Sequence, residues 1–135
     1  MTDNTNNLPN GLPQQLRTVP FPPAHAQTEY SFEFQSKNGQ WEINGVTWSD
    51  VNQRVLAKPQ RGSVQKWQLA NSAGGWSHPI HIHLVDLQIV SRTGGRGAVM
   101  PYEKVALKDV MWLDTNEKIE VVARYAPWDG VYMFQ

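Results

Sequence analysis

The sequence predicts an all-β domain, built as a sandwich or barrel from many short strands. Short segments in which apolar and polar residues alternate recur along the chain, and turn signals separate them. No segment has the periodicity of a helix of ten residues or more. The chain has 135 residues, 40% of them hydrophobic and 18% charged, which suits one globular domain with its own core.

The chain divides into a tail and a domain. Residues 1–27 are rich in Asn, Gln and Pro, and a segment of this composition buries little apolar surface. We therefore expect residues 1–27 to form an extended polar, Pro-rich tail or linker. Residues 28–135, where the alternating segments begin, are expected to form the domain.

The individual strands are predicted from alternation along the chain. Tyr30, Phe32 and Phe34 share one face of the first strand, and Trp67 and Leu69 share one face of a later strand. Asn-Gly pairs between the early strands are typical of hairpin turns. The expected strands cover residues 28–34, 40–44, 46–48, 64–69, 80–90, 105–113, 118–125 and 131–134.

Two segments between the strands carry expectations of their own. Ser49 is a suitable N-cap, so residues 49–53 are predicted to form a short helical turn. Residues 91–97 are rich in Gly and Arg and are predicted to form a mobile loop. In such a loop Arg92 and Arg96 would be solvated.

Composition excludes several classes of function. The chain contains no cysteine, which rules out disulfides, thiolate nucleophiles and Cys-ligated metal sites. The formal net charge is zero, and no long apolar run is present, so neither a nucleic-acid partner nor a membrane partner is expected. No apolar signal segment begins the chain, which predicts a cytoplasmic location for the chain as written. A longer parent protein would also be compatible with secretion.

The most informative segment holds three of the four histidines within six residues. It runs Trp76-Ser-His78-Pro-Ile-His81-Ile-His83. Because side chains alternate along a strand, His81 and His83 should project to one side, about 7 Å apart along the strand, and Ile80, Ile82 and Leu84 to the other. Imidazole is the commonest ligand for copper and zinc, and this spacing favours two separate metal ions or a bridged pair. Ordinary surface or hydrogen-bonded histidines are the alternative interpretation.

This segment resembles the H-P-x-H-x-H motif of the multicopper oxidases, and of the bilirubin-oxidase and spore-coat-laccase branch in particular. The resemblance covers nearly the whole chain from about Leu12 onward and is highly specific. It implies the C-terminal (third) cupredoxin domain of such an enzyme, a cupredoxin-like Greek-key β-sandwich or barrel. The matching segments are residues 32–34, 38–41, 43–45, 78–86, 99–102, 107–109, 125–127 and 130–134.

The resemblance also implies a role for each histidine. His78 occupies the position of a type 1 copper ligand, His81 that of a type 2 ligand and His83 that of a type 3 ligand. Trp76 would lie on the substrate side of the type 1 copper. Asp86 and Asp109 are candidates for hydrogen bonds to the ligating imidazoles, although ordinary strand-end or turn carboxylates are as well supported.

The sequence departs from the family pattern after Phe134. In the family, this strand continues into a His-Cys-His motif that completes the copper sites, whereas here Gln135 follows. We therefore expect the copper-loop segment to be missing and the copper sites to be only partial. His25 stands alone in the tail and is expected to be solvated.

Three functions remain open from the sequence. The first is a partial multicopper oxidase that couples oxidation of phenol-type or bilirubin-type substrates to reduction of dioxygen to water. It would be inactive alone, or would need upstream cupredoxin domains or a complementing chain. The second is a non-catalytic copper-binding or interaction module, and the third is a repurposed metal-free biosynthetic enzyme. An exposed sheet edge at the last strand would favour a homo-oligomer.

Overall fold

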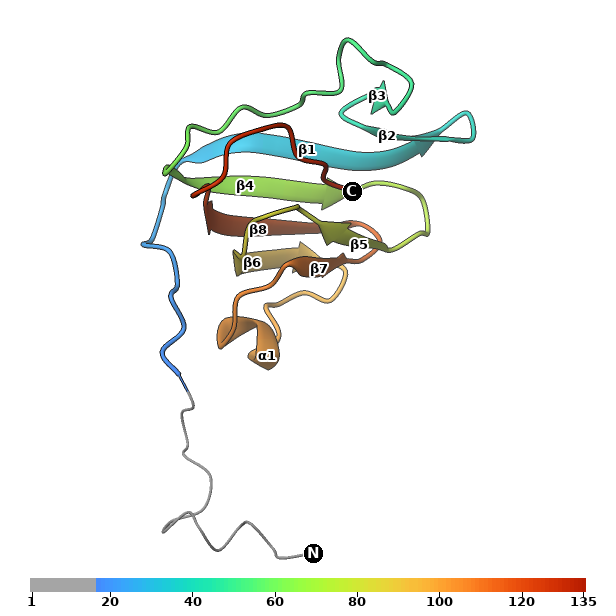
Figure 1. Cartoon of the computed structure of the whole chain (residues 1–135). Coiled ribbons are helices and arrows are strands. Elements are labelled where there is room, and N and C mark those ends of the chain that lie inside the picture. The colour runs from blue at the N-terminus through green and yellow to red at the C-terminus, as the bar shows by residue number, and fades with distance from the viewer. Residues whose placement is uncertain (1–16) are drawn as a thin grey trace, which may run out of the picture.

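The computed structural model describes residues 17–135, and nearly all of its regular structure is β-strand (Figure 1). Residues 17–27 contain no helix or strand, and the rest of the predicted tail lies outside the described residues. The elements are β1 (Thr28–Lys37), β2 (Gln40–Ile43), β3 (Val46–Thr47), β4 (Val64–Asn71), β5 (His78–His81), β6 (Leu87–Gly94), α1 (Pro101–Lys104), β7 (Val110–Leu113) and β8 (Glu117–Arg124).

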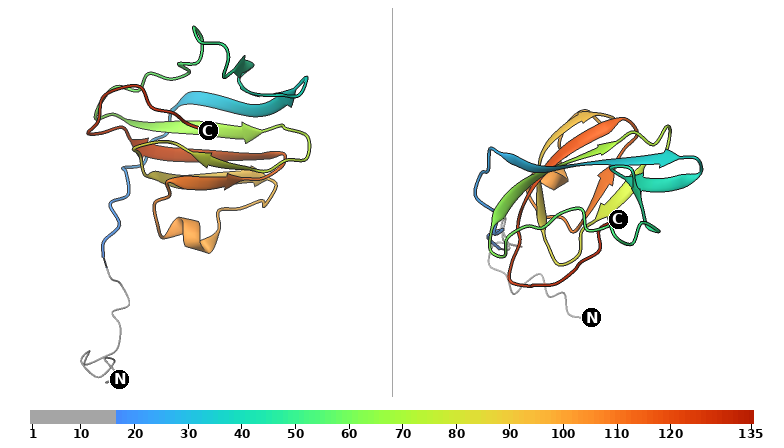
Figure 2. Two further views of the ribbon diagram at one scale, coloured as in Figure 1. Left: turned by 45° about the vertical axis from the view of Figure 1, so that its right-hand side comes forward. Right: turned by 90° about the horizontal axis from the view of Figure 1, so that it is seen from above.

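The strands form two sheets, as the sequence predicted for a sandwich. The larger sheet has the order β3-β2-β1-β4-β8-β6, and the smaller one pairs β5 with β7. Among the strand pairs of residues 17–135, only β1 and β4 run parallel. Figure 2 shows the small sheet lying across one face of the large one. Each sheet contributes one apolar face to the core between them, which is how two half-buried sheets remove apolar surface from water.

The predicted alternation in β1 and β4 is confirmed. Phe32 and Phe34 are buried on β1, and Trp67 and Leu69 are buried on β4. Phe134, from the last residues of the chain, packs against Phe32 with ring centroids 5.0 Å apart. The end of the chain therefore closes the core that the first strand opens.

The single strand predicted over residues 80–90 is wrong. The chain leaves the small sheet after β5 and enters the large sheet at β6, and Leu84 turns the corner with a φ of 62°. Ile80 and Leu87 are both buried, one from each sheet. A continuous apolar run is the pattern of one buried strand, but two strands on opposite sides of a core produce the same pattern.

The prediction of a Gly/Arg-rich loop over residues 91–97 is also wrong for the first half of that segment. β6 continues to Gly94, and Arg92 is only 4% exposed. The Arg92 guanidinium is buried because Glu103 of α1 and Glu117 of β8 both pair with it. These two carboxylates lie 11 and 25 residues away in the sequence, so no local pattern indicated the burial.

Three smaller predictions need correction. The strand expected over residues 105–113 is shorter, because α1 precedes it and β7 begins only at Val110. Residues 49–53 form hydrogen-bonded turns rather than a helical turn, and the Asp50 carboxylate accepts the Thr47 N–H in place of a Ser49 cap. The strand expected over residues 131–134 is reduced to one β-bridge, between Ile82 and Phe134.

Within residues 17–135, no helix is long and apolar enough to cross a membrane.

Candidate metal site

The histidine segment lies on β5 and in the residues that follow it. β5 pairs antiparallel with β7, which sets His78 opposite Leu113 and His81 opposite Val110. Ile80 and Ile82 are buried at 1% and 5% exposure, whereas His81 and His83 are half-buried on the other face. The predicted apolar face agrees with these exposures for Ile80 and Ile82 but not for Leu84, which is 54% exposed because the chain turns there.

His81 and His83 lie closer together than the strand rise suggested. Their ring centroids are 4.8 Å apart, with an angle of 49° between the ring planes. β5 ends at His81, and backbone hydrogen bonds to the last residues of the chain hold the segment as far as His83, where a turn begins. His83 N–H donates to the Met133 carbonyl, and His81 exchanges two hydrogen bonds with Gln135. The rings therefore form a pair on one surface.

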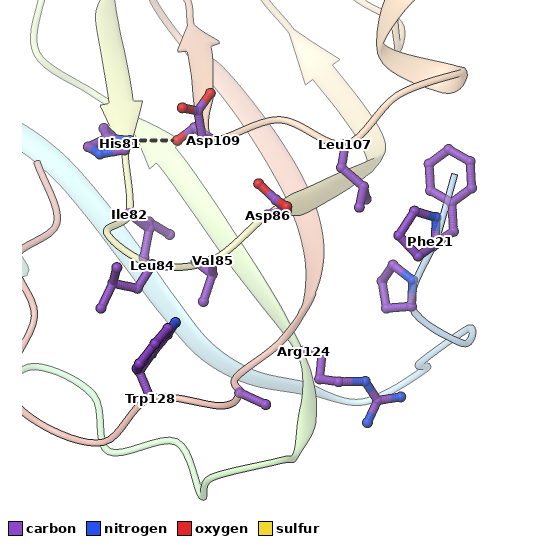
Figure 3. Close-up of a pocket in the computed structure, with 13 residues that line it drawn as sticks. Phe21, His81, Ile82, Leu84, Val85, Asp86, Leu107, Asp109, Arg124 and Trp128 are labelled. Carbon is purple, nitrogen blue, oxygen red and sulfur yellow. Dashed lines mark hydrogen bonds between the residues drawn. The ribbon is translucent and has the colours of Figure 1, made fainter. Parts of the chain in front are cut away.

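The His81 ring is oriented by the chain beside it. Its Nδ1 lies 2.8 Å from the main-chain carbonyl oxygen of Asp109, and this contact is drawn as the dashed line in Figure 3. A carbonyl only accepts, so Nδ1 carries the proton and Nε2 keeps its lone pair for a ligand. Asp109 was a candidate for this contact from the sequence, but its main chain makes the contact rather than its carboxylate.

His78 lies in a different environment, at the end of the core. Its ring is 4.7 Å from the Trp41 ring, which meets it edge to face, and 6.5 Å from the Phe34 ring. Its Nε2 is buried and has no hydrogen-bond partner. Burial lowers the pKa of His78 below its usual 6.5, so the imidazole is neutral at physiological pH. A buried, neutral and unpartnered nitrogen is suited to a metal ligand.

Two tryptophans lie near His78. Trp76, which the resemblance places on the substrate side of the type 1 copper position, is 65% exposed and packs against Trp41 with ring centroids 6.3 Å apart. Trp41 is the residue in direct contact with His78, and the sequence did not single it out. Trp41 is on β2, 37 positions earlier in the chain, and only the tertiary fold brings it to β5.

A cavity of about 760 Å³ opens beside His81 (Figure 3). Its polar groups include the side chains of Asp86, Asp109 and Arg124, and Trp128 and Phe21 contribute aromatic rings. A cavity of this size is in the usual range for a small-molecule site. The lining residues are Pro20, Phe21, Pro22, His81, Ile82, Leu84, Val85, Asp86, Leu107, Asp109, Arg124, Ala126 and Trp128.

The described residues do not hold a complete metal site. No group of three or more His, Cys, Asp or Glu side chains in residues 17–135 is arranged to bind one ion. His25 is not part of the histidine segment. Its ring, expected to be solvated, is half-buried and hydrogen-bonded to the Glu29 carboxylate.

Comparison with known sequences finds one family and several relatives. The family model described as "Multicopper oxidase" matches residues 20–135. The chain is 48% identical over 134 residues to a bilirubin oxidase from Albifimbria verrucaria, which covers 98% of this chain and 23% of that protein. It is 31% identical over 91 residues to a laccase from Haloferax volcanii, which covers 67% of this chain and 15% of that protein. The chain thus spans less than a quarter of these two relatives.

Solved structures share the fold. A multi-copper oxidase from Pediococcus acidilactici superposes with a TM-score of 0.69 at 25% identity, over 84% of this chain and 24% of that one. The McoA multicopper oxidase from Aquifex aeolicus superposes with a TM-score of 0.68 at 22% identity, over 86% of this chain and 26% of that one. At this identity the second match supports the fold alone.

Proposed function

The chain belongs to the multicopper oxidase family and has its cupredoxin-like fold, and we propose that it is the C-terminal copper-ligating domain of such an oxidase. His78, His81 and His83 would each serve a different copper in this proposal. The observation that carries it is the division of the segment into His78, whose Nε2 is buried, on one face and the His81–His83 pair on the other. The segment that contains β5 thereby presents imidazoles on two opposite faces, where they can bind different metal ions.

The donor atoms fit copper. His78 offers a buried nitrogen with no other partner, and His81 offers an Nε2 that the Asp109 carbonyl leaves free. Neutral imidazole is a good ligand for copper. Copper bound there would supply one-electron chemistry, in which electrons from the substrate reduce dioxygen to water.

The aromatic side chains next to His78 favour a flat substrate. Trp41 is 50% exposed and Trp76 is 65% exposed, so both offer ring surface to a ligand while Trp41 touches the His78 ring. Phenols and tetrapyrroles have flat π-faces that stack on indole rings. We therefore propose that Trp41, as well as the expected Trp76, contacts substrate beside His78.

The ligands that the described residues lack would come from elsewhere. Since the chain spans about a quarter of the bilirubin oxidase that it matches, the proposal places the remaining cupredoxin domains in a longer polypeptide or in a complementing chain. Oxidase activity is accordingly proposed for the assembly, and the isolated chain is expected to be inactive.

A chimera tests this proposal. The matching stretch of the Albifimbria verrucaria bilirubin oxidase is replaced by residues 2–134, so that the oxidase's own residues follow Phe134, and bilirubin oxidation and copper content are measured. We expect an active chimera that loses activity with His78→Ala, His81→Ala or His83→Ala and keeps it with the matched control His25→Ala. An active chimera that tolerates His81→Ala would overturn the ligand assignment.

A second candidate function is a non-catalytic metal-binding module. The observation that favours it is the distance of 4.8 Å between the His81 and His83 rings, which allows both to bind one ion. Metal analysis of the isolated chain, without an oxidase assay, tests this alternative directly.

A further inference from the structure

Two Asn-Gly pairs form matching turns at the two ends of β2 (Figure 1). Asn38-Gly39 joins β1 to β2, and Asn44-Gly45 joins β2 to β3. All four residues have a φ between 51° and 76°, and two-residue hairpin loops of type I′ require a positive φ at both positions. All four residues are also exposed. The two pairs are therefore alike in residue type, backbone conformation and exposure.

The two asparagine side chains differ in how they are held. The Asn44 side-chain amide is fixed to β1 through both of its polar atoms. Its Oδ1 accepts the main-chain N–H of Glu33 at 2.7 Å, and its Nδ2 donates to the Ser31 carbonyl at 2.9 Å. Among residues 17–135, no group forms a hydrogen bond with the Asn38 side chain. We propose that Asn38 is a site of spontaneous deamidation and that the fold protects Asn44 from the same reaction.

The reaction needs only the chain itself and water. The main-chain nitrogen of Gly39 loses its proton and attacks the side-chain amide carbon of Asn38, which forms a C–N bond and expels ammonia. Water then opens the cyclic succinimide at either carbonyl, which leaves an aspartate or an isoaspartate in place of Asn38. Glycine favours the attack because it has no Cβ to crowd the nitrogen. At Asn44, both hydrogen bonds to β1 must break before the amide carbon is free to react.

The isoaspartate product lengthens the main chain. Its main chain passes through the former side chain, which adds one carbon to a loop of only two residues. The longer loop disturbs the pairing of Lys37 with Gln40, which closes the turn. β2 also carries Trp41, whose ring packs edge to face on His78 at 4.7 Å. Deamidation of Asn38 thus alters the hairpin that brings Trp41 to His78.

Peptide mapping of aged protein tests the proposal. The purified full chain is incubated at mildly alkaline pH, and mass spectrometry follows the loss of each side-chain amide over time. Cleavage after Glu33 and Glu42 releases Asn38 within residues 34–42 and leaves Asn44 in the next peptide. We expect Asn38 to deamidate about tenfold faster than Asn44, because two hydrogen bonds hold the Asn44 amide. Equal rates, or a faster reaction at Asn44, overturn the proposal.

The same incubation in guanidinium chloride shows whether the fold causes the difference. In the unfolded chain neither amide is held, and both asparagines precede glycine, so the two rates should become similar. If Asn44 still reacts more slowly than Asn38 in the denaturant, the neighbouring residues cause the difference and the proposal is wrong.

A matched variant tests the effect on the hairpin. Anion-exchange chromatography separates the deamidated chains by their added negative charge, and peptide mapping identifies those with isoaspartate at position 38. The control is Asn38→Asp, which carries the same charge without the additional main-chain carbon and tolerates the positive φ. We expect the isoaspartate chain to melt at a lower temperature than Asn38→Asp. Equal melting temperatures would contradict the proposed disturbance of the hairpin.

Discussion

Arg92 and Glu103 form a bidentate ion pair inside the domain. Arg92 Nη2 lies 2.6 Å from one carboxylate oxygen of Glu103, and Arg92 Nε lies 2.8 Å from the other. The same guanidinium donates to Glu117 and to the Trp112 carbonyl. These contacts join β6 to α1, β7 and β8. Because β7 carries the partners of β5, the ion pair supports the strand that presents the histidines.

Removing Arg92 should destabilise the domain strongly. The side chains of Arg92 and Glu117 are fully buried, and that of Glu103 is 3% exposed, so Arg92→Met leaves two buried carboxylates with only the more distant Arg96, at 3.6 Å and 4.0 Å. Breaking a buried pair in this way costs roughly 3–5 kcal/mol. Urea denaturation measures the loss in the free energy of unfolding. The control is Arg61→Met, which removes an exposed pair with Asp129 and should cost less than about 1 kcal/mol. Equal losses in the two variants would refute this role of Arg92.

Acid should destabilise the domain partly through Glu103. Burial alone would raise the pKa of this carboxyl, but hydrogen bonds from Arg92 and the Met100 N–H and the charges of Arg92 and Arg96 bring it below 4.5. A folded-state pKa below the unfolded value stabilises the protein above about pH 4.5, and this contribution disappears as the pH falls through the folded-state pKa. The variant Glu103→Gln should be less stable at neutral pH but lose less stability on acidification. Urea unfolding at a series of pH values measures how the free energy of unfolding falls with pH in the original chain and in Glu103→Gln. An equal fall in the two proteins would contradict the prediction.

Gly94 should not tolerate a side chain. Its φ is 70°, and a Cβ at this position would lie 2.1 Å from the main-chain oxygen of Asn116. Gly97 has a similar φ of 79° but open space around it. Gly97→Ala should therefore cost only the backbone strain, about 1 kcal/mol, whereas Gly94→Ala should cost at least about 2 kcal/mol more. Thermal unfolding of the two variants gives the comparison, and similar melting temperatures would show that the β6–β8 end moves to make room.

Asn71 should be needed to hold the start of β5. This residue is 3% exposed, and its amide nitrogen donates to the main-chain oxygens of Trp76 and Asp114, at 2.6 Å and 3.1 Å. Asn71→Ala leaves these part-buried acceptors without the amide and should cost about 1–3 kcal/mol. The exposed Asn52 is the control, since Asn52→Ala should change the free energy of unfolding by less than about 0.5 kcal/mol. If both changes are neutral, water replaces the amide at this site.

Alternation along the chain was enough to predict the all-β class and the buried faces of β1 and β4. It also placed His81 and His83 together on the face opposite Ile80 and Ile82. These features depend on the two-residue period of an extended chain, which any sequence records directly. The family membership likewise came from residues in sequence order, led by the His78–His83 motif.

Other features depended on the tertiary structure alone. The corner at Leu84, the burial of Arg92 between two glutamates, and the contact of Trp41 with His78 each join residues that belong to different strands or sheets. The polarity of a residue indicates whether it lies on the buried or the exposed face of a strand. It does not indicate which distant segment of the chain will contact it. The sequence by itself therefore determined the fold class and the histidine face of the strand. The packing of the two sheets decided which side chains surround each histidine and how far apart the imidazoles lie.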